Sequence, residues 1–110
     1  MKQSEIKFTI GLDENKVPEK IQWEATDSGM EGKKECGATM LALWDTKENT
    51  TLRIDLWTKD MPVEDMKRFF YECFMSMADT YERATQDNEN GGEIRKFSEW
   101  FAKNSVKSAQ

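Results

Sequence analysis

The spacing of the apolar residues changes once along the chain, and this change limits the folds that the sequence can adopt. Before Asp60, apolar residues alternate with polar ones, which is typical of strands that turn one face to a core. After Pro62, apolar residues recur every three or four positions, which is typical of amphipathic helices. Strands that precede helices, with no β–α–β alternation, predict an α+β fold with an antiparallel sheet.

The alternating half of the chain predicts strands at residues 4–12, 19–25, 37–45 and 51–58. Turn residues between the first two strands and between the last two predict two hairpins. Residues 40–44 are apolar throughout and could form a helical turn or a buried strand, and we interpret them as a strand. Residues 27–34 show no periodicity and predict a loop.

The second half predicts helices at residues 61–84 and 93–104, with Asp60 as the N-cap of the first and Pro62 in its first turn. Oppositely charged residues four apart predict surface ion pairs, Glu64 with Arg68 and Asp79 with Arg83. The expected apolar faces contain Val63, Met66, Phe70, Cys73, Phe74, Met77 and Tyr81 in the first helix, and Ile94, Phe97, Trp100 and Phe101 in the second.

These elements predict a single α+β domain over residues 1–110. It would contain a four-stranded antiparallel sheet followed by two C-terminal helices packed on one face. The tail from Ser105 to Gln110 lacks apolar periodicity, so we expect it to fray.

Composition limits the classes of function. The formal net charge is −5, and no basic run interleaved with aromatic residues is present, so nucleic acid is not an expected partner. The absence of histidine removes chemistry that depends on an imidazole base, together with the commonest metal ligand. The chain has neither a signal-peptide pattern nor about 18 consecutive apolar residues, so we expect a cytoplasmic protein without a membrane span.

Three features of the sequence could serve as chemical sites. Carboxylates are abundant, but a catalytic pair would need one desolvated acid at a defined distance from the other, which spacing does not reveal. Residues 87–92 share some positions with a calcium loop, yet the twelfth position is Ser98 instead of glutamate, which favours an ordinary linker. Cys36 and Cys73 are expected to be buried thiols, because they lie at a strand position and on a helix stripe, and without histidine or a Cys-x-x-Cys spacing they form no zinc site. The sequence therefore predicts no catalytic residue, cofactor or metal.

Trp57 is the residue least expected on an ordinary surface. If residues 51–58 form a strand, Trp57 shares a face with Arg53 and Asp55, directed away from the helices and near Trp44 or Met40. This face could bind a partner, or Trp57 could lie flat over aliphatic stems of charged side chains.

Several segments resemble the GldC family of gliding-motility proteins. The resemblance covers residues 4 to about 85, is most specific at residues 52–61 (LRIDLWTKDM), and includes 7–10, 17–21, 23–27, 66–70 and 77–85. It implies a cytoplasmic accessory protein associated with gliding motility, in a family for which no catalytic residue or cofactor is carried over.

The leading hypothesis is a non-enzymatic interaction protein that offers a sheet face or edge to a protein partner or to a second copy of itself. An alternative is a carrier of a small apolar ligand, with a pocket between sheet and long helix lined by Phe70, Phe74, Met77 and Trp23. An enzyme based on carboxylates is the third hypothesis.

Overall fold

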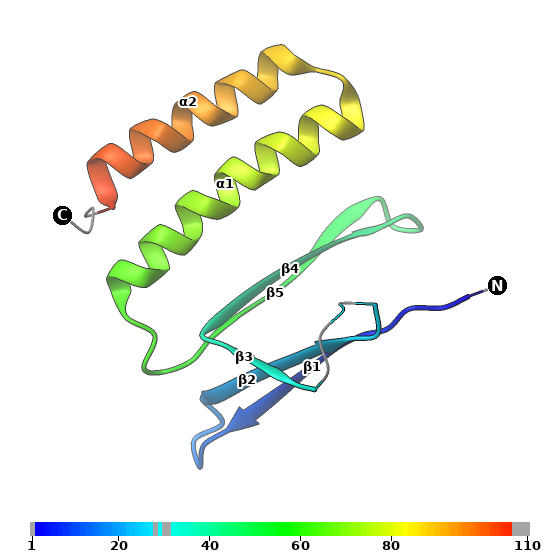
Figure 1. The fold of residues 1–110 in the computed structure, drawn as a ribbon, viewed down its shortest axis with the longest axis vertical. Helices are drawn as coiled ribbons and strands as arrows, with labels where there is room; N and C mark the ends of the chain where they lie inside the picture. The colour runs from blue at the N-terminus through cyan, green and yellow to red at the C-terminus, as the bar shows by residue number, and fades with distance from the viewer. Residues whose placement is uncertain (1, 28, 30–31, 107–110) are drawn as a thin grey trace. The chain divides into compact units, whose positions relative to one another are not determined.

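The computed structural model describes residues 2–27, 29 and 32–106, and the chain divides into two compact units, each described by itself. The first unit, Met1–Met61, holds the strands, and the second, Pro62–Gln110, holds the helices (Figure 1). The elements are β1 (Ile6–Leu12), β2 (Pro18–Ala25), β3 (Lys34–Cys36), β4 (Ala38–Asp45), β5 (Thr50–Trp57), α1 (Val63–Thr85) and α2 (Asn88–Ser105).

The predicted α+β class, the antiparallel pairing and the two C-terminal helices are confirmed, but the single four-stranded sheet is wrong. The described strands form a three-stranded sheet in the order β1-β2-β3 and a two-stranded sheet of β4 and β5. Both predicted hairpins are present, as β1–β2 and β4–β5. The packing of the helices on one face of a sheet stays a prediction.

The sheet divides at Gly37, between β3 and β4. Before this residue the chain pairs with β2, and after it the chain pairs with β5. A Cβ atom at Gly37 would lie 2.7 Å from the Sδ atom of Met61, so the bare backbone permits this close approach. β3 falls partly in the segment expected to be a loop, because its three residues are too few for alternation to be recognised. Residues 28, 30 and 31 of that expected loop lie outside the described residues.

The core of the three-stranded sheet is centred on Ile21 in the middle strand. Ile21 lies opposite Ile10 of β1 and Cys36 of β3, and its side chain is fully buried. A central strand buries its side chains more completely than an edge strand, because neighbours flank it on both sides.

The turn between β1 and β2 is held to the residues that follow β5. The Asp13 carboxylate accepts hydrogen bonds from the N–H groups of Asn15 and Val17, at 2.8 and 3.0 Å, and from Nζ of Lys59 at 3.0 Å. The bond from Val17 and the Lys59 cation hold the pKa of Asp13 below its ordinary value. The Lys59 N–H also donates to the carbonyl of Pro18 at 3.0 Å, so the two sheets of this unit are joined at this point.

Helix α1 begins at Val63, two residues after the predicted start at residue 61, and its cap differs from the predicted one. Its N-cap is Pro62, without a side-chain cap, whereas the predicted cap, Asp60, accepts a hydrogen bond from the Thr58 hydroxyl at 2.8 Å. The helix ends at Thr85, close to the predicted end, and Gln86 adopts the left-handed conformation with its N–H bonded to an earlier carbonyl.

Helix α2 begins at Asn88, five residues before the predicted start at residue 93. The Asp87 carboxylate caps it by accepting the N–H of Asn90 at 3.1 Å, and it also accepts the Tyr81 hydroxyl of α1 at 2.8 Å. The expected linker is therefore the first turn of a helix, and Asp87 serves as its cap. Among the residues described, neither helix is long and apolar enough to span a bilayer. Residues 107–110 of the expected fraying tail lie outside the described part of the chain, and Ser105 is still helical.

The two helices form an antiparallel pair whose contact is largely aromatic (Figure 1). The ring of Phe74 meets those of Phe70, Phe97 and Phe101 edge-on, with centroids 6.0, 5.4 and 5.3 Å away. Such edge-to-face pairs contribute about 0.5–1.5 kcal/mol each beyond the area that they bury. Ala78 is fully buried in the same pair, where its small side chain lets the helices approach closely.

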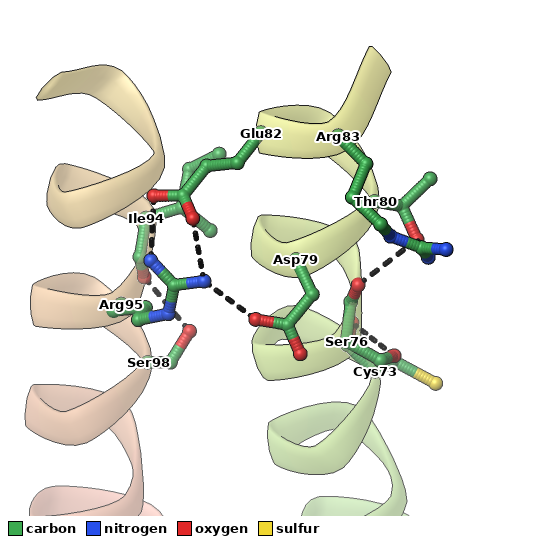
Figure 2. A network of polar contacts seen from close by, with 9 residues as sticks. All are labelled: Cys73, Ser76, Asp79, Thr80, Glu82, Arg83, Ile94, Arg95 and Ser98. Carbon is green, nitrogen blue, oxygen red and sulfur yellow. Dashed lines mark hydrogen bonds and ion pairs between the residues drawn. The ribbon is translucent and has the colours of Figure 1, made fainter. Parts of the chain in front are cut away.

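An ion cluster joins the helices near their connection (Figure 2). The Arg95 guanidinium donates to both carboxylate oxygens of Glu82, at 2.6 and 2.9 Å, and to Asp79 at 2.5 Å. The bonds to Glu82 and Asp79 raise the pKa of Arg95, and the bond from Arg95 lowers the pKa of Glu82. The predicted pair of Asp79 with Arg83 is wrong, because the carboxylate turns to α2 while Arg83 donates to the Thr80 hydroxyl.

The predicted pair of Glu64 with Arg68 is also wrong. Lys67 approaches Glu64 at 3.5 Å, and Arg68 binds Glu72 at 3.1 Å. Each of these pairs is exposed, so the exchange of partners has little energetic consequence.

Gly91 gives the ion cluster its space, and replacing it with alanine should disrupt the cluster. A Cβ atom at Gly91 would collide with the side chain of Glu82, which would have to leave Arg95. We expect Gly91→Ala to lower the free energy of unfolding by about 1–3 kcal/mol, the usual cost of overpacking. Urea denaturation followed by the helical circular dichroism signal measures this change.

The neighbouring Gly92 provides the matched control. A Cβ atom at Gly92 would meet open space, so Gly92→Ala should leave stability unchanged or raise it by up to about 1 kcal/mol, because alanine favours helices over glycine. Equal stabilities for the two variants would show that the Glu82 side chain does not restrict position 91.

Candidate interaction surface

The hairpin of β4 and β5 places the predicted surface residues on one face. Its register sets Trp57 opposite Ala38, Asp55 opposite Met40, Arg53 opposite Ala42 and Thr51 opposite Trp44. Because side chains alternate between the two faces of a sheet, these residues share a face. The structure therefore brings Arg53, Asp55, Trp57 and Trp44 onto one side of the hairpin.

Arg53 and Asp55 form a bidentate ion pair along β5. Nε of Arg53 donates to one Asp55 carboxylate oxygen at 3.1 Å, and a terminal nitrogen donates to the other at 2.9 Å. The bond from Arg53 holds the pKa of Asp55 below its ordinary value. Both side chains are exposed, so they are charged and accessible to a binding partner.

Two tryptophans lie at opposite ends of this face. Trp57 is 57% exposed and Trp44 is 62% exposed. Trp44 lies beside Thr51, six positions from Trp57 along β5, which corresponds to roughly 20 Å. The expected proximity of Trp57 to Trp44 is therefore wrong, whereas Met40 is its diagonal neighbour. Large aromatic side chains with more than half of their surface exposed are typical of protein interfaces.

The opposite face of the hairpin is also apolar and half exposed, which sequence reasoning missed. Leu43 lies opposite Leu52, and Leu41 lies opposite Ile54. Leu43, Leu52 and Ile54 each leave about half of their surface exposed. Alternation predicts only that one face of a strand packs on a core, and the exposed fractions show that much of the surface of these residues is accessible. An isolated two-stranded hairpin is marginally stable in water, so further contacts to it would stabilise it.

The residues proposed to line an apolar pocket divide between the two units. Trp23 belongs to β2, whereas Phe70, Phe74 and Met77 belong to α1. Phe74 is in contact with three phenyl rings of the helix pair, which favours a filled core at this position over the wall of a cavity. The ligand-carrier hypothesis stays a prediction.

The two cysteines are half-buried, so the predicted full burial of Cys36 and Cys73 is wrong. Burial raises the pKa of both thiols, and nearby Glu72 adds to the effect at Cys73. Both groups therefore favour the protonated thiol over the reactive thiolate.

The family comparison agrees with the resemblance seen in the sequence. A family model described as "Gliding motility-associated protein GldC-like" matches residues 18–107. Neither a curated protein nor a solved structure matches the chain.

Proposed function

Because the chain belongs to the GldC-like family of gliding motility-associated proteins, we propose that it is a cytoplasmic, non-enzymatic accessory protein that acts through protein–protein contacts. The observation that carries this proposal is the face of the β4–β5 hairpin. There, exposed Trp44 and Trp57 flank the Arg53–Asp55 ion pair. Exposed aromatic residues beside a bidentate arginine are a combination enriched in protein interfaces.

The pKa directions of four carboxylates argue against one enzymatic role for these groups, that of a general acid. Hydrogen bonds from N–H or hydroxyl donors and from cations lower the pKa values of Asp13, Asp55, Glu82 and Asp87. A general acid near neutral pH needs a raised pKa instead. These four groups are therefore suited to structural and binding roles.

Replacing Trp57 with alanine should weaken association while leaving the fold intact. We expect an affinity about tenfold lower or weaker still, because truncation of an interface tryptophan often costs this much. Light scattering would report the mass of the purified chain, and co-purification from the host at mild salt would report partner recovery. Circular dichroism would show whether the fold is retained.

Trp100→Ala is the matched control, since Trp100 lies on α2 and is 59% exposed, nearly the same fraction as Trp57. It should change neither mass nor recovery. If Trp57→Ala also leaves both unchanged, the hairpin face is not the binding surface and the proposal fails.

A further inference from the structure

The outer edge of β5 at Arg53 and Asp55 carries backbone groups that pair with no other strand among the described residues, whereas just beyond the strand the Lys59 N–H bonds the Pro18 carbonyl of β2. In the two-stranded sheet β5 pairs only with β4 among the described residues. The Thr58 N–H donates to the Gly37 carbonyl at 2.9 Å, so this N–H points toward β4, and the Lys59 N–H one residue later points to the other side. Backbone direction alternates along a strand, so Arg53 and Asp55 direct their N–H and C=O groups away from β4. Such an edge is a template for pairing with another strand.

The side chains along this edge are complementary to a reversed copy of themselves. When two β5 strands run antiparallel with Ile54 opposite Ile54, Arg53 of each copy lies opposite Asp55 of the other. Both residues direct their backbone groups outward, so each Arg53–Asp55 position is also a hydrogen-bonded pair. The charge pattern and the backbone pattern therefore select the same register.

Neighbouring registers are disfavoured by charge. Two neighbouring alignments also bring the outward backbone groups opposite each other. One is centred on Arg53 and places two arginines opposite each other, and the other is centred on Asp55 and places two aspartates opposite each other. The outer edge of β4 between Ala38 and Trp44 contains no charged residue, so it offers no comparable selection. This comparison favours β5 as the pairing edge.

The same register joins the exposed apolar residues of the two copies. Leu52 of one copy lies opposite Leu56 of the other, beside the central Ile54 pair, so the apolar face continues across the junction. On the other face, Trp57 lies opposite Thr51 of the second copy, whose neighbour on β4 is Trp44. The small side chain of Thr51 leaves room for the ring of Trp57 in one copy to approach the ring of Trp44 in the other.

We propose that two copies of this chain associate by antiparallel pairing of β5 with β5, about a two-fold axis at Ile54, to form a continuous four-stranded sheet. The two-fold symmetry makes the interface isologous, as in most homodimers. This inference rests on the proposed function, because it assigns the second copy as a partner of the β4–β5 hairpin.

Charge reversal tests the register directly. Arg53→Asp alone and Asp55→Arg alone each place like charges opposite each other, so each variant should raise the dimer dissociation constant about tenfold or more. An equimolar mixture of the two variants restores opposite charges at both positions and should form heterodimers with nearly the original affinity. Sedimentation equilibrium measures all three samples.

A cysteine at the two-fold position provides a second readout. In a chain whose Cys36 and Cys73 are replaced by alanine, Ile54→Cys should give a covalent dimer on oxidation, because facing residues at a non-hydrogen-bonded position are about 4.5 Å apart between Cα atoms. Leu52→Cys in the same background should give little covalent dimer, since Leu52 of one copy faces Leu56 of the other and not a second Leu52.

The outcomes separate this inference from the proposed function. A monomeric wild-type chain, a mixture that does not recover, or equal cross-linking at positions 52 and 54 would overturn β5–β5 pairing. If Trp57→Ala still lowers partner recovery in that case, the proposed function stands with a different partner. If Trp57→Ala has no effect either, both are overturned.

Discussion

Replacing Ile21 with alanine is expected to lower the free energy of unfolding by about 2–5 kcal/mol. Ile21 occupies the middle strand of the three-stranded sheet, and its side chain is fully buried between Ile10 and Cys36 on the flanking strands. The substitution removes apolar contacts and leaves a cavity that the paired backbones cannot close. Such a loss is a large fraction of the 5–15 kcal/mol that typically stabilises a domain.

Ile6→Ala makes the same chemical change in the same sheet. Ile6 lies at the start of edge strand β1 and is 71% exposed, so its loss should cost less than about 1 kcal/mol. Urea denaturation of both variants gives the comparison. Similar midpoints would mean that Ile21 is not the centre of the core of this unit.

Phe74→Ala should destabilise the helix pair by about 2–3 kcal/mol, less than the usual cost at a fully buried aromatic residue because Phe74 is half-buried. The Phe74 ring meets one phenyl ring of its own helix, Phe70, and two of α2, Phe97 and Phe101. Its removal therefore takes away the shared neighbour of three side chains. Denaturant unfolding monitored at the helical circular dichroism band measures the loss.

Trp100→Ala serves as the control for the helix pair. Trp100 is larger than Phe74 but mostly exposed, and among the described residues its ring contacts only that of Phe97. We expect a cost below about 1 kcal/mol for this variant. A loss at Trp100 equal to that at Phe74 would contradict the central place of Phe74.

Sequence periodicity predicted the elements that have one apolar face over many residues. The alternation from Ile6 to Leu12 and the helical spacing after Pro62 were read correctly, because a strand or helix with one buried face repeats its pattern several times. The ambiguous apolar segment around Met40 was also correctly interpreted as a strand.

Periodicity does not predict features that are set by a few specific contacts, such as strand β3 and the first residues of the two helices. Strand β3 exists through its pairing with β2, which a segment of three residues cannot reveal by itself. The predicted start of α2 is too late because residues 87–92, which include Gly91, resemble a linker. In the structure Gly91 lies inside the helix, and its missing side chain leaves space for the side chain of Glu82. The Asp60 cap was misplaced because its carboxylate binds Thr58 instead.

The candidate surface was predicted in part. Alternation alone assigned Arg53, Asp55 and Trp57 to one face, and the register confirms that they share it. The sequence could not give the register of Trp44 or the unpaired edge of β5, since both depend on which strands meet. The exposure of the opposite face could not be predicted either. Apolar residues alternate in the same way along a strand whether or not another element covers them.

The pairing order within each unit has a consequence for synthesis of the chain. In the described residues, every hydrogen-bonded ladder and the helix pair join elements that are consecutive in the sequence. Hairpins form within about 1–10 μs, whereas a ribosome adds roughly 5–20 residues per second. Each hairpin can therefore form as soon as its second strand emerges from the ribosome, and β5 can present its edge to a neighbouring nascent chain before the helix pair has emerged.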